Sequence, residues 1–64
     1  MKHAQADYIN AGSRYEKATS ADRARAVAET IRHMIQGEAL DDQSEARYLI
    51  ERGRQEARQE VNHV

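Results

Sequence analysis

The chain has 64 residues, a formal net charge of −1 and no cysteine or proline. The lack of cysteine excludes disulfide bonds, cysteine-ligated zinc sites and thiol catalysis, and the nearly balanced charge is not typical of a protein that binds nucleic acid by charge alone. Alanine supplies 11 of the residues and phenylalanine and tryptophan are absent, so the apolar side chains suffice for one small core.

The composition predicts an all-α fold, either a three-helix small bundle or a helical hairpin with an extended third helix. Alanine, glutamate, arginine and glutamine favour helix, and no stretch shows the apolar–polar alternation of a strand. We expect residues 1–64 to form a single small helical domain, with helices at about 3–18, 20–36 and 43–62. Because a domain of this size is marginally stable alone, we also expect a homo-oligomer.

Large and small apolar residues alternate at helical spacing in the first predicted helix, residues 3–18: Ala4, Tyr8, Ala11, Tyr15 and Ala18. Such a stripe interdigitates well with a neighbouring helix. Gly12 lies beside the stripe and would let a partner backbone approach closely, although it weakens the helix by up to about 1 kcal/mol relative to alanine. The short connection at 17–20 predicts that the first two helices form an antiparallel hairpin or a corner.

The second predicted helix, residues 20–36, carries the densest run of large apolar side chains. Its apolar face comprises Ala24, Val27, Ile31 and Met34 at 3-4-3 spacing, widened by Ala28 and Ile35. Thr19 or Ser20 is suited to cap its start, and Gly37 is suited to end it in the left-handed conformation. Any fold must cover the face of Val27, Ile31, Met34 and Ile35.

The third predicted helix, residues 43–62, follows an acidic connection. We expect Leu40 to point back onto the core and Asp41 or Asp42 to cap the helix. Its inner stripe is predicted to contain Ala46, Ile50, Gly53 and Ala57, with Leu49 beside it and Val61 beyond. The charged second half is expected to be solvated and to extend past the other helices.

No pattern in the chain predicts catalysis or a cofactor. The serine and threonine hydroxyls have no recognisable base, and no glycine-rich phosphate loop is present, so we do not expect an enzyme. His3, His33 and His63 lack the spacing of a helical metal pair. The N-terminal Met1-Lys2-His3 could bind Cu(II) or Ni(II) if the amine is free, a property of any such terminus.

The candidate partner-binding residues are aromatic or basic. Tyr8, Tyr15 and Tyr48 are the only aromatics, and we expect them in the core with their hydroxyls at its rim; alternatively, some of them anchor a partner. Tyr8 and Tyr15 are the first candidates if their stripe is exposed. Arg47, Arg54 and Arg58 follow, because they share one face of the third helix, where glutamates interleave with them.

These patterns favour a non-enzymatic protein–protein interaction module, a small regulator, inhibitor or accessory subunit that acts through helix faces on another protein. The alternative is a dimeric nucleic-acid-binding regulator that uses arginines of helices 2 and 3. No apolar run approaches the roughly 20 residues of a membrane span, and the N-terminus lacks a signal-peptide core. We therefore expect a cytoplasmic protein without a membrane partner.

Overall fold

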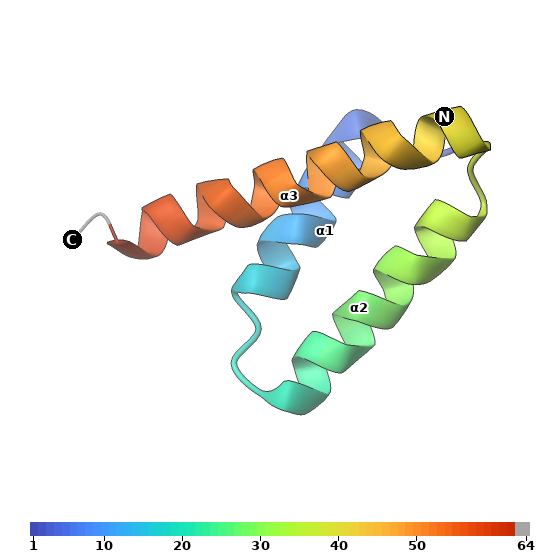
Figure 1. Cartoon of the computed structure of the whole chain (residues 1–64). Helices are drawn as coiled ribbons and strands as arrows, with labels where there is room; N and C mark the ends of the chain where they lie inside the picture. Colours follow the sequence, from blue (N-terminus) through green and yellow to red (C-terminus); the bar gives the residue numbers. More distant parts are fainter. Residues whose placement is uncertain (63–64) are drawn as a thin grey trace.

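The fold, seen in a computed structural model that describes residues 1–62, consists of three helices (Figure 1). They are α1 (Gln5–Glu16), α2 (Ala21–Gln36) and α3 (Leu40–Asn62), and no strand occurs among the described residues. The helices pack as a small all-α bundle in which α1 lies mainly against α3, and α2 runs obliquely from the end of α1 to the start of α3. The predicted all-α fold is confirmed.

The crossing of α1 and α3 is made by two buried glycines. A Cβ atom added to Gly12 would overlap the backbone carbonyl oxygen of Ile50, and one added to Gly53 would overlap that of Ile9. Each glycine therefore lies directly against the backbone of the other helix, because it has no side chain to hold the two apart. The prediction that Gly12 permits close approach of a partner backbone is confirmed.

The core lies along this crossing. It is a cluster of Tyr8 from α1 with Ala46, Leu49 and Ile50 from α3, and Ile9 packs against its edge. Ala11 and Ala57 are also buried, so the predicted inner stripe of the third helix is confirmed as far as Ala57. The side chain of Val61 and the whole of residues 63–64 lie outside the described part of the chain.

Helix α2 is the least covered of the three, although it has the richest apolar face. None of its residues is buried, and Ile31, Met34 and Ile35 only partly cover the core cluster. The expectation that any fold must cover this face is met only in part. The physical reason is that Gly12 and Gly53 bring α1 and α3 together, so that α2 leans on the side of that pair instead of lying between them.

The α2–α3 connection differs from the prediction in three ways. Helix α3 begins at Leu40, so Asp41 and Asp42 lie in its first turn instead of capping it. Leu40 is 81% exposed and does not plug the core, whereas Glu38, two residues before it, is buried. Helix α2 ends before Gly37, as predicted, but Gly37 has a φ of −76°, a right-handed conformation that any residue adopts, so only the predicted left-handed conformation is wrong.

The start of α2 agrees with the prediction. The Ser20 side-chain oxygen accepts a hydrogen bond from the Arg23 backbone N–H at 3.2 Å, which satisfies one of the free amides of the first turn. A corresponding bond at the start of α1 joins the Ala4 N–H to the Asp7 carboxylate at 3.3 Å. Both helix starts are therefore encoded locally, within a few residues.

The three tyrosines occupy three different environments. Tyr8 is 0% exposed, Tyr15 is half-buried, and Tyr48 is 66% exposed. The expectation of a core position is wrong for Tyr48. It follows Ala46 by two residues, which at 100° per residue turns it to the far side of α3 from the inner stripe.

Candidate functional site

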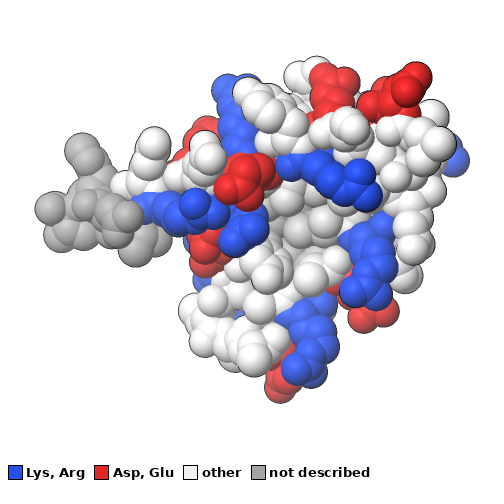
Figure 2. All heavy atoms as spheres, in the orientation of Figure 1, with Lys and Arg blue, Asp and Glu red and all other residues white. Residues whose placement is uncertain are grey.

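An open groove between α2 and α3 is the strongest candidate site. Its volume is about 350 Å³, and its apolar lining is Ala28, Ile31 and Ile35 from α2. On this face of the molecule, a surface without charged side chains is bordered by several lysine and arginine side chains, with acidic side chains beside some of them (Figure 2). The groove exists because the apolar face of α2 extends beyond the part that α1 and α3 cover.

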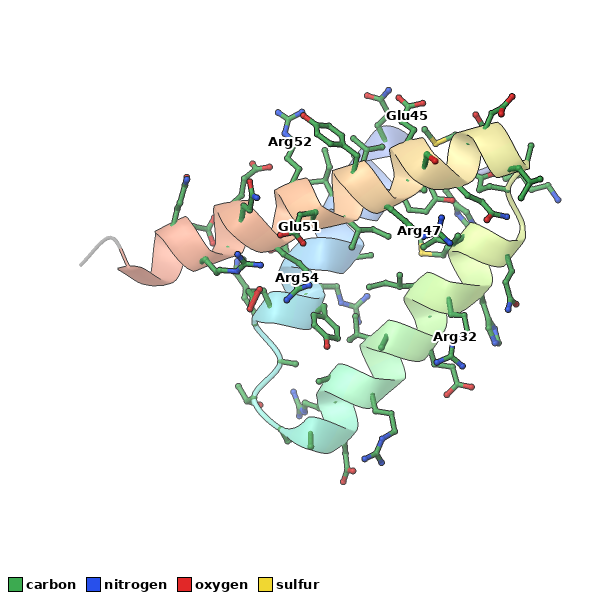
Figure 3. The ribbon with its side chains drawn as sticks, in the orientation of Figure 1. Arg32, Glu45, Arg47, Glu51, Arg52 and Arg54 are labelled. Carbon is green, nitrogen blue, oxygen red and sulfur yellow. The ribbon has the colours of Figure 1, made fainter. Side chains whose placement is uncertain are left out.

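Two arginines flank the groove from opposite helices, Arg32 from α2 and Arg47 from α3 (Figure 3). Both side chains are exposed, and among residues 1–62 neither forms an ion pair. A guanidinium carries five N–H donors in a planar fork that matches a carboxylate. The groove therefore combines an apolar floor with unoccupied donors for an anion on each side.

Tyr8 and Tyr15, the first sequence candidates, do not form an exposed stripe. Tyr8 is wholly enclosed in the core, so it is not available as a surface contact. The ring of Tyr15 lies under the Arg54 guanidinium, 5.0 Å from its carbon to the ring centroid. This cation–π contact stabilises the end of α1 against α3.

Two of the three predicted arginines are engaged within the chain. Arg54 and Arg58 donate to one Glu16 oxygen at 3.2 and 2.8 Å, and Arg58 also contacts Glu51 at 3.3 Å. The hydrogen bond from Arg58, followed by that from Arg54, holds the pKa of Glu16 below its usual value, and the same bond raises the pKa of Arg58. These arginines tie α1 to α3, whereas Arg47 alone of the three lines the groove.

A buried carboxylate, Glu38, was not singled out from the sequence. It is 6% exposed; its Oε1 accepts from the Lys2 backbone N–H at 2.7 Å and its Oε2 from the Tyr8 hydroxyl at 2.8 Å. Its own carbonyl oxygen accepts from the Gln43 side chain at 3.1 Å. The cluster joins the N-terminal segment, α1 and the α2–α3 turn, and its role is structural because both carboxylate oxygens are occupied.

The pKa values in this cluster move in opposite directions. The Lys2 N–H and then the Tyr8 hydroxyl stabilise the carboxylate and lower the pKa of Glu38, although burial opposes this shift. Burial, followed by the hydrogen bond to Glu38, raises the pKa of the Tyr8 hydroxyl. The folded state therefore favours an ionised Glu38 beside a neutral Tyr8 over a wide pH range.

No group of three or more His, Cys, Asp or Glu side chains within residues 1–62 is placed to hold a metal ion. The His3 ring instead packs edge-on against the Tyr8 ring, 5.7 Å away between centroids. The Lys2 backbone nitrogen, one of the atoms that a Cu(II) or Ni(II) chelate would need, donates to Glu38. Binding of either metal at this terminus stays a prediction, and His63 lies outside the described residues.

Arg47 is a partner-binding candidate from the sequence, whereas Arg32 enters there only among the arginines of helices 2 and 3 in the nucleic-acid alternative. The two are brought to one groove only by the packing of α2 beside α3. The apolar residues of the groove were visible in the sequence as part of the α2 stripe, but they were assigned to the core. None of the helices within residues 1–62 is both long and apolar enough to span a membrane. No family model, curated protein or solved structure matches this chain.

Proposed function

We propose that the protein is a non-enzymatic protein–protein interaction module whose α2–α3 groove binds an acidic amphipathic helix of another protein. The observation that carries this proposal is the half-covered apolar face of α2, on which no residue is buried. A helix laid into an apolar groove is a common mode of peptide recognition, and it buries such a face without any change of fold. A small regulator, inhibitor or accessory subunit could act in this way.

The charges around the groove specify the chemistry of the partner. Arg32 and Arg47 stand on its two sides without anionic partners among residues 1–62. Acidic side chains that flank the partner's apolar face would pair with them, while its apolar residues cover Ile31 and Ile35. Complementary charge of this kind favours the correct partner and speeds association.

The test uses a designed amphipathic peptide with leucine on one face and glutamate on its flanks, and a matched peptide with lysine in place of glutamate. We expect the acidic peptide to bind, and the double substitution Arg32→Glu with Arg47→Glu to weaken its binding at least about tenfold, because attraction becomes repulsion. Fluorescence anisotropy of the labelled peptides, measured at low and high salt, provides the affinities.

Arg52→Glu is the matched control, because Arg52 lies on another side of α3, 3.5 Å from Glu56 (Figure 3). This substitution changes the net charge by as much as each of the two groove substitutions does, but it leaves the groove intact. The affinity for the acidic peptide should therefore stay within about twofold of the wild type. Equal binding of both peptides, or equal weakening by the control, would contradict the proposal. A homodimer that blocks the peptide would instead assign the groove to a second copy of the chain.

The alternative function is a dimeric nucleic-acid-binding regulator. In its favour, Arg23, Arg32 and Arg47 form no ion pairs among residues 1–62; against it, Arg54 and Arg58 are bound to glutamates. Binding to DNA or RNA that weakens steeply with salt and requires a dimer would support this alternative. Anisotropy with labelled oligonucleotides and light scattering on the same samples distinguish the two functions.

A further inference from the structure

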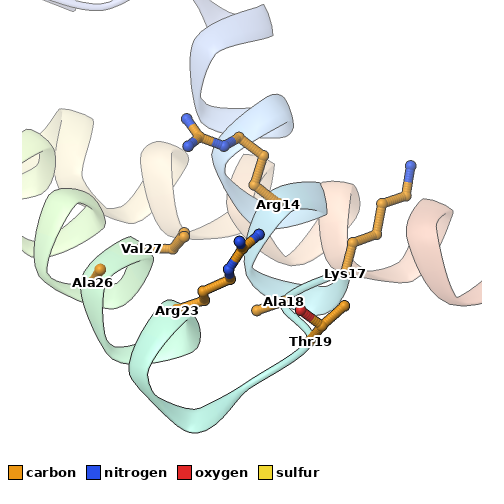
Figure 4. A pocket seen from close by; sticks show the side chains of 7 residues that line it. All are labelled: Arg14, Lys17, Ala18, Thr19, Arg23, Ala26 and Val27. Atoms are coloured by element: carbon orange, nitrogen blue, oxygen red, sulfur yellow. The ribbon is translucent and has the colours of Figure 1, made fainter.

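A second hollow lies between α1 and α2, and it shares no lining residue with the α2–α3 groove. Its volume is about 390 Å³, within the range of small-molecule sites. Three basic side chains line it: Arg14 from the last turn of α1, Lys17 directly after the end of α1, and Arg23 from the first turn of α2 (Figure 4). Ala18, Ala26 and Val27 supply the apolar part of its wall.

The positive charge of this α1–α2 cleft is poorly balanced by the chain itself. Among residues 1–62, Arg14 and Arg23 form no ion pair. Lys17 lies 2.7 Å from Glu60, but the two side chains are 49% and 65% exposed, so water screens the pair strongly.

Three other carboxylates of α1 and α2 have partners elsewhere. Glu16 accepts hydrogen bonds from Arg54 and Arg58, and Asp22 lies 3.6 Å from Arg25. Asp7, in a hollow that also contains Arg14, accepts from the Ala4 N–H. A protein with a net charge of −1 thus places two cations without ion-pair partners among residues 1–62, Arg14 and Arg23, beside Lys17 at one hollow, where a bound anion would relieve their repulsion.

The side chains present select the kind of anion. Guanidinium forks bind the oxygens of phosphate or carboxylate in pairs, and a lysine ammonium adds a point charge. A phosphomonoester carries about −1.5 to −2 at pH 7, which suits two or three cations better than the single charge of a carboxylate. The apolar wall of Ala26 and Val27 suits an organic group attached to the phosphate.

From this geometry we propose that the α1–α2 cleft binds a phosphomonoester that carries an apolar group, with Arg14 and Arg23 on the phosphate. A free phosphate ester and a phosphorylated tyrosine side chain of a partner share this chemistry. The site is separate in its residues from the α2–α3 groove, so either can exist without the other.

The probe is phenyl phosphate, compared with inorganic phosphate and benzoate by NMR titration of the arginine side-chain N–H signals. We expect saturable binding of phenyl phosphate, tightest of the three, with shifts at Arg14 and Arg23. Arg14→Gln and Arg23→Gln should each weaken it about tenfold. Arg25→Gln and Arg52→Gln, which remove exposed and already paired arginines, should leave it within about twofold.

A phosphotyrosine peptide that binds more tightly than phenyl phosphate at the same residues would identify a protein as the source of the ester; the reverse order would identify a free metabolite. No saturation below about 10 mM, or equal weakening by the control variants, would overturn the proposal. The proposal would also be overturned if an oligonucleotide shifted the NMR signals of Arg14 and Arg23 and phenyl phosphate did not. Unchanged circular dichroism of each variant confirms that the fold is intact.

Discussion

Replacing Gly12 or Gly53 by alanine is expected to force α1 and α3 apart and to destabilise the bundle strongly. A Cβ at Gly12 overlaps the Ile50 carbonyl oxygen and lies 2.8 Å from its carbon; at Gly53 the corresponding atoms belong to Ile9. These neighbours are backbone atoms, so they cannot rotate aside as the end of a side chain could. The helices must shift as whole units, which disrupts the core along the crossing.

The expected loss is large relative to the stability of so small a domain. Alanine favours helix by about 1 kcal/mol over glycine, but overpacking typically costs 1–3 kcal/mol and more where backbone must move. At roughly 0.05–0.15 kcal/mol per residue, a chain of this length has only about 3–10 kcal/mol of stability. We expect a net loss of about 2 kcal/mol or more for alanine, and a larger loss for Gly53→Leu.

Urea and thermal unfolding followed by circular dichroism measures this effect, with Gly37→Ala as the matched control. At Gly37 the nearest atom to an added Cβ is the Met34 carbonyl oxygen at 3.6 Å, an ordinary contact, and the backbone conformation suits alanine. The control should be neutral or stabilising by up to about 1 kcal/mol. If Gly12→Ala or Gly53→Ala had the same free energy of unfolding as the wild type, the backbones of α1 and α3 would not be in contact.

Tyr8→Phe is expected to have the second large effect, a loss of about 1.5–3 kcal/mol, the usual range for a hydrogen bond to a charged group. The substitution keeps the ring in the core and removes only the hydroxyl that donates to Glu38 at 2.8 Å. The buried carboxylate is then left with fewer donors. Tyr48→Phe removes a hydroxyl from a 66% exposed residue and should change stability by less than about 0.5 kcal/mol.

The pH dependence of stability should follow from the same pair. The pKa of Glu38 is lower in the folded than in the unfolded chain, so its contribution is present above the ordinary value of 4.5 and is lost as the pH falls below it. The pKa of Tyr8 is raised, so its contribution is present below its ordinary value of 10.0 and is lost as the pH rises above it.

Urea unfolding of the wild type, Tyr8→Phe and Glu38→Gln across this pH range tests the assignment. Tyr8→Phe should remove the alkaline loss due to this hydroxyl and weaken the acid loss, because Glu38 keeps its bond to Lys2 but loses one donor. Glu38→Gln should flatten the acid side more strongly. If neither variant changes the shape of the pH profile, the two groups are not coupled in the folded state.

The local features of the fold were predictable from the sequence. The Ser20 cap, the α-helical content and the inner stripe of Ala46, Ile50 and Ala57 depend on residues a few positions apart, whose propensity and spacing act over one or two turns. Gly12 could be interpreted in the same way, because a glycine beside an apolar stripe invites close packing. These features can be predicted without knowing which helices pack against each other.

The candidate sites depended on the tertiary arrangement. The α2 stripe looks like the centre of the fold in sequence, yet the two glycines bring α1 and α3 together and leave it half covered. The same arrangement turns Leu40 outward and buries Glu38, although an isolated sequence favours the opposite.

The arginines of α2 and α3 also show what the sequence determines and what the tertiary structure decides. In the sequence, Arg32, Arg47, Arg54 and Arg58 all belong to helices of mixed charge. Only the packing of α1 on α3 joins Arg54 and Arg58 to Glu16, 38 and 42 residues away, while Arg32 and Arg47 meet at an open groove. Helix content followed from local physical chemistry, whereas pairing, burial and exposure were decided by contacts between distant residues.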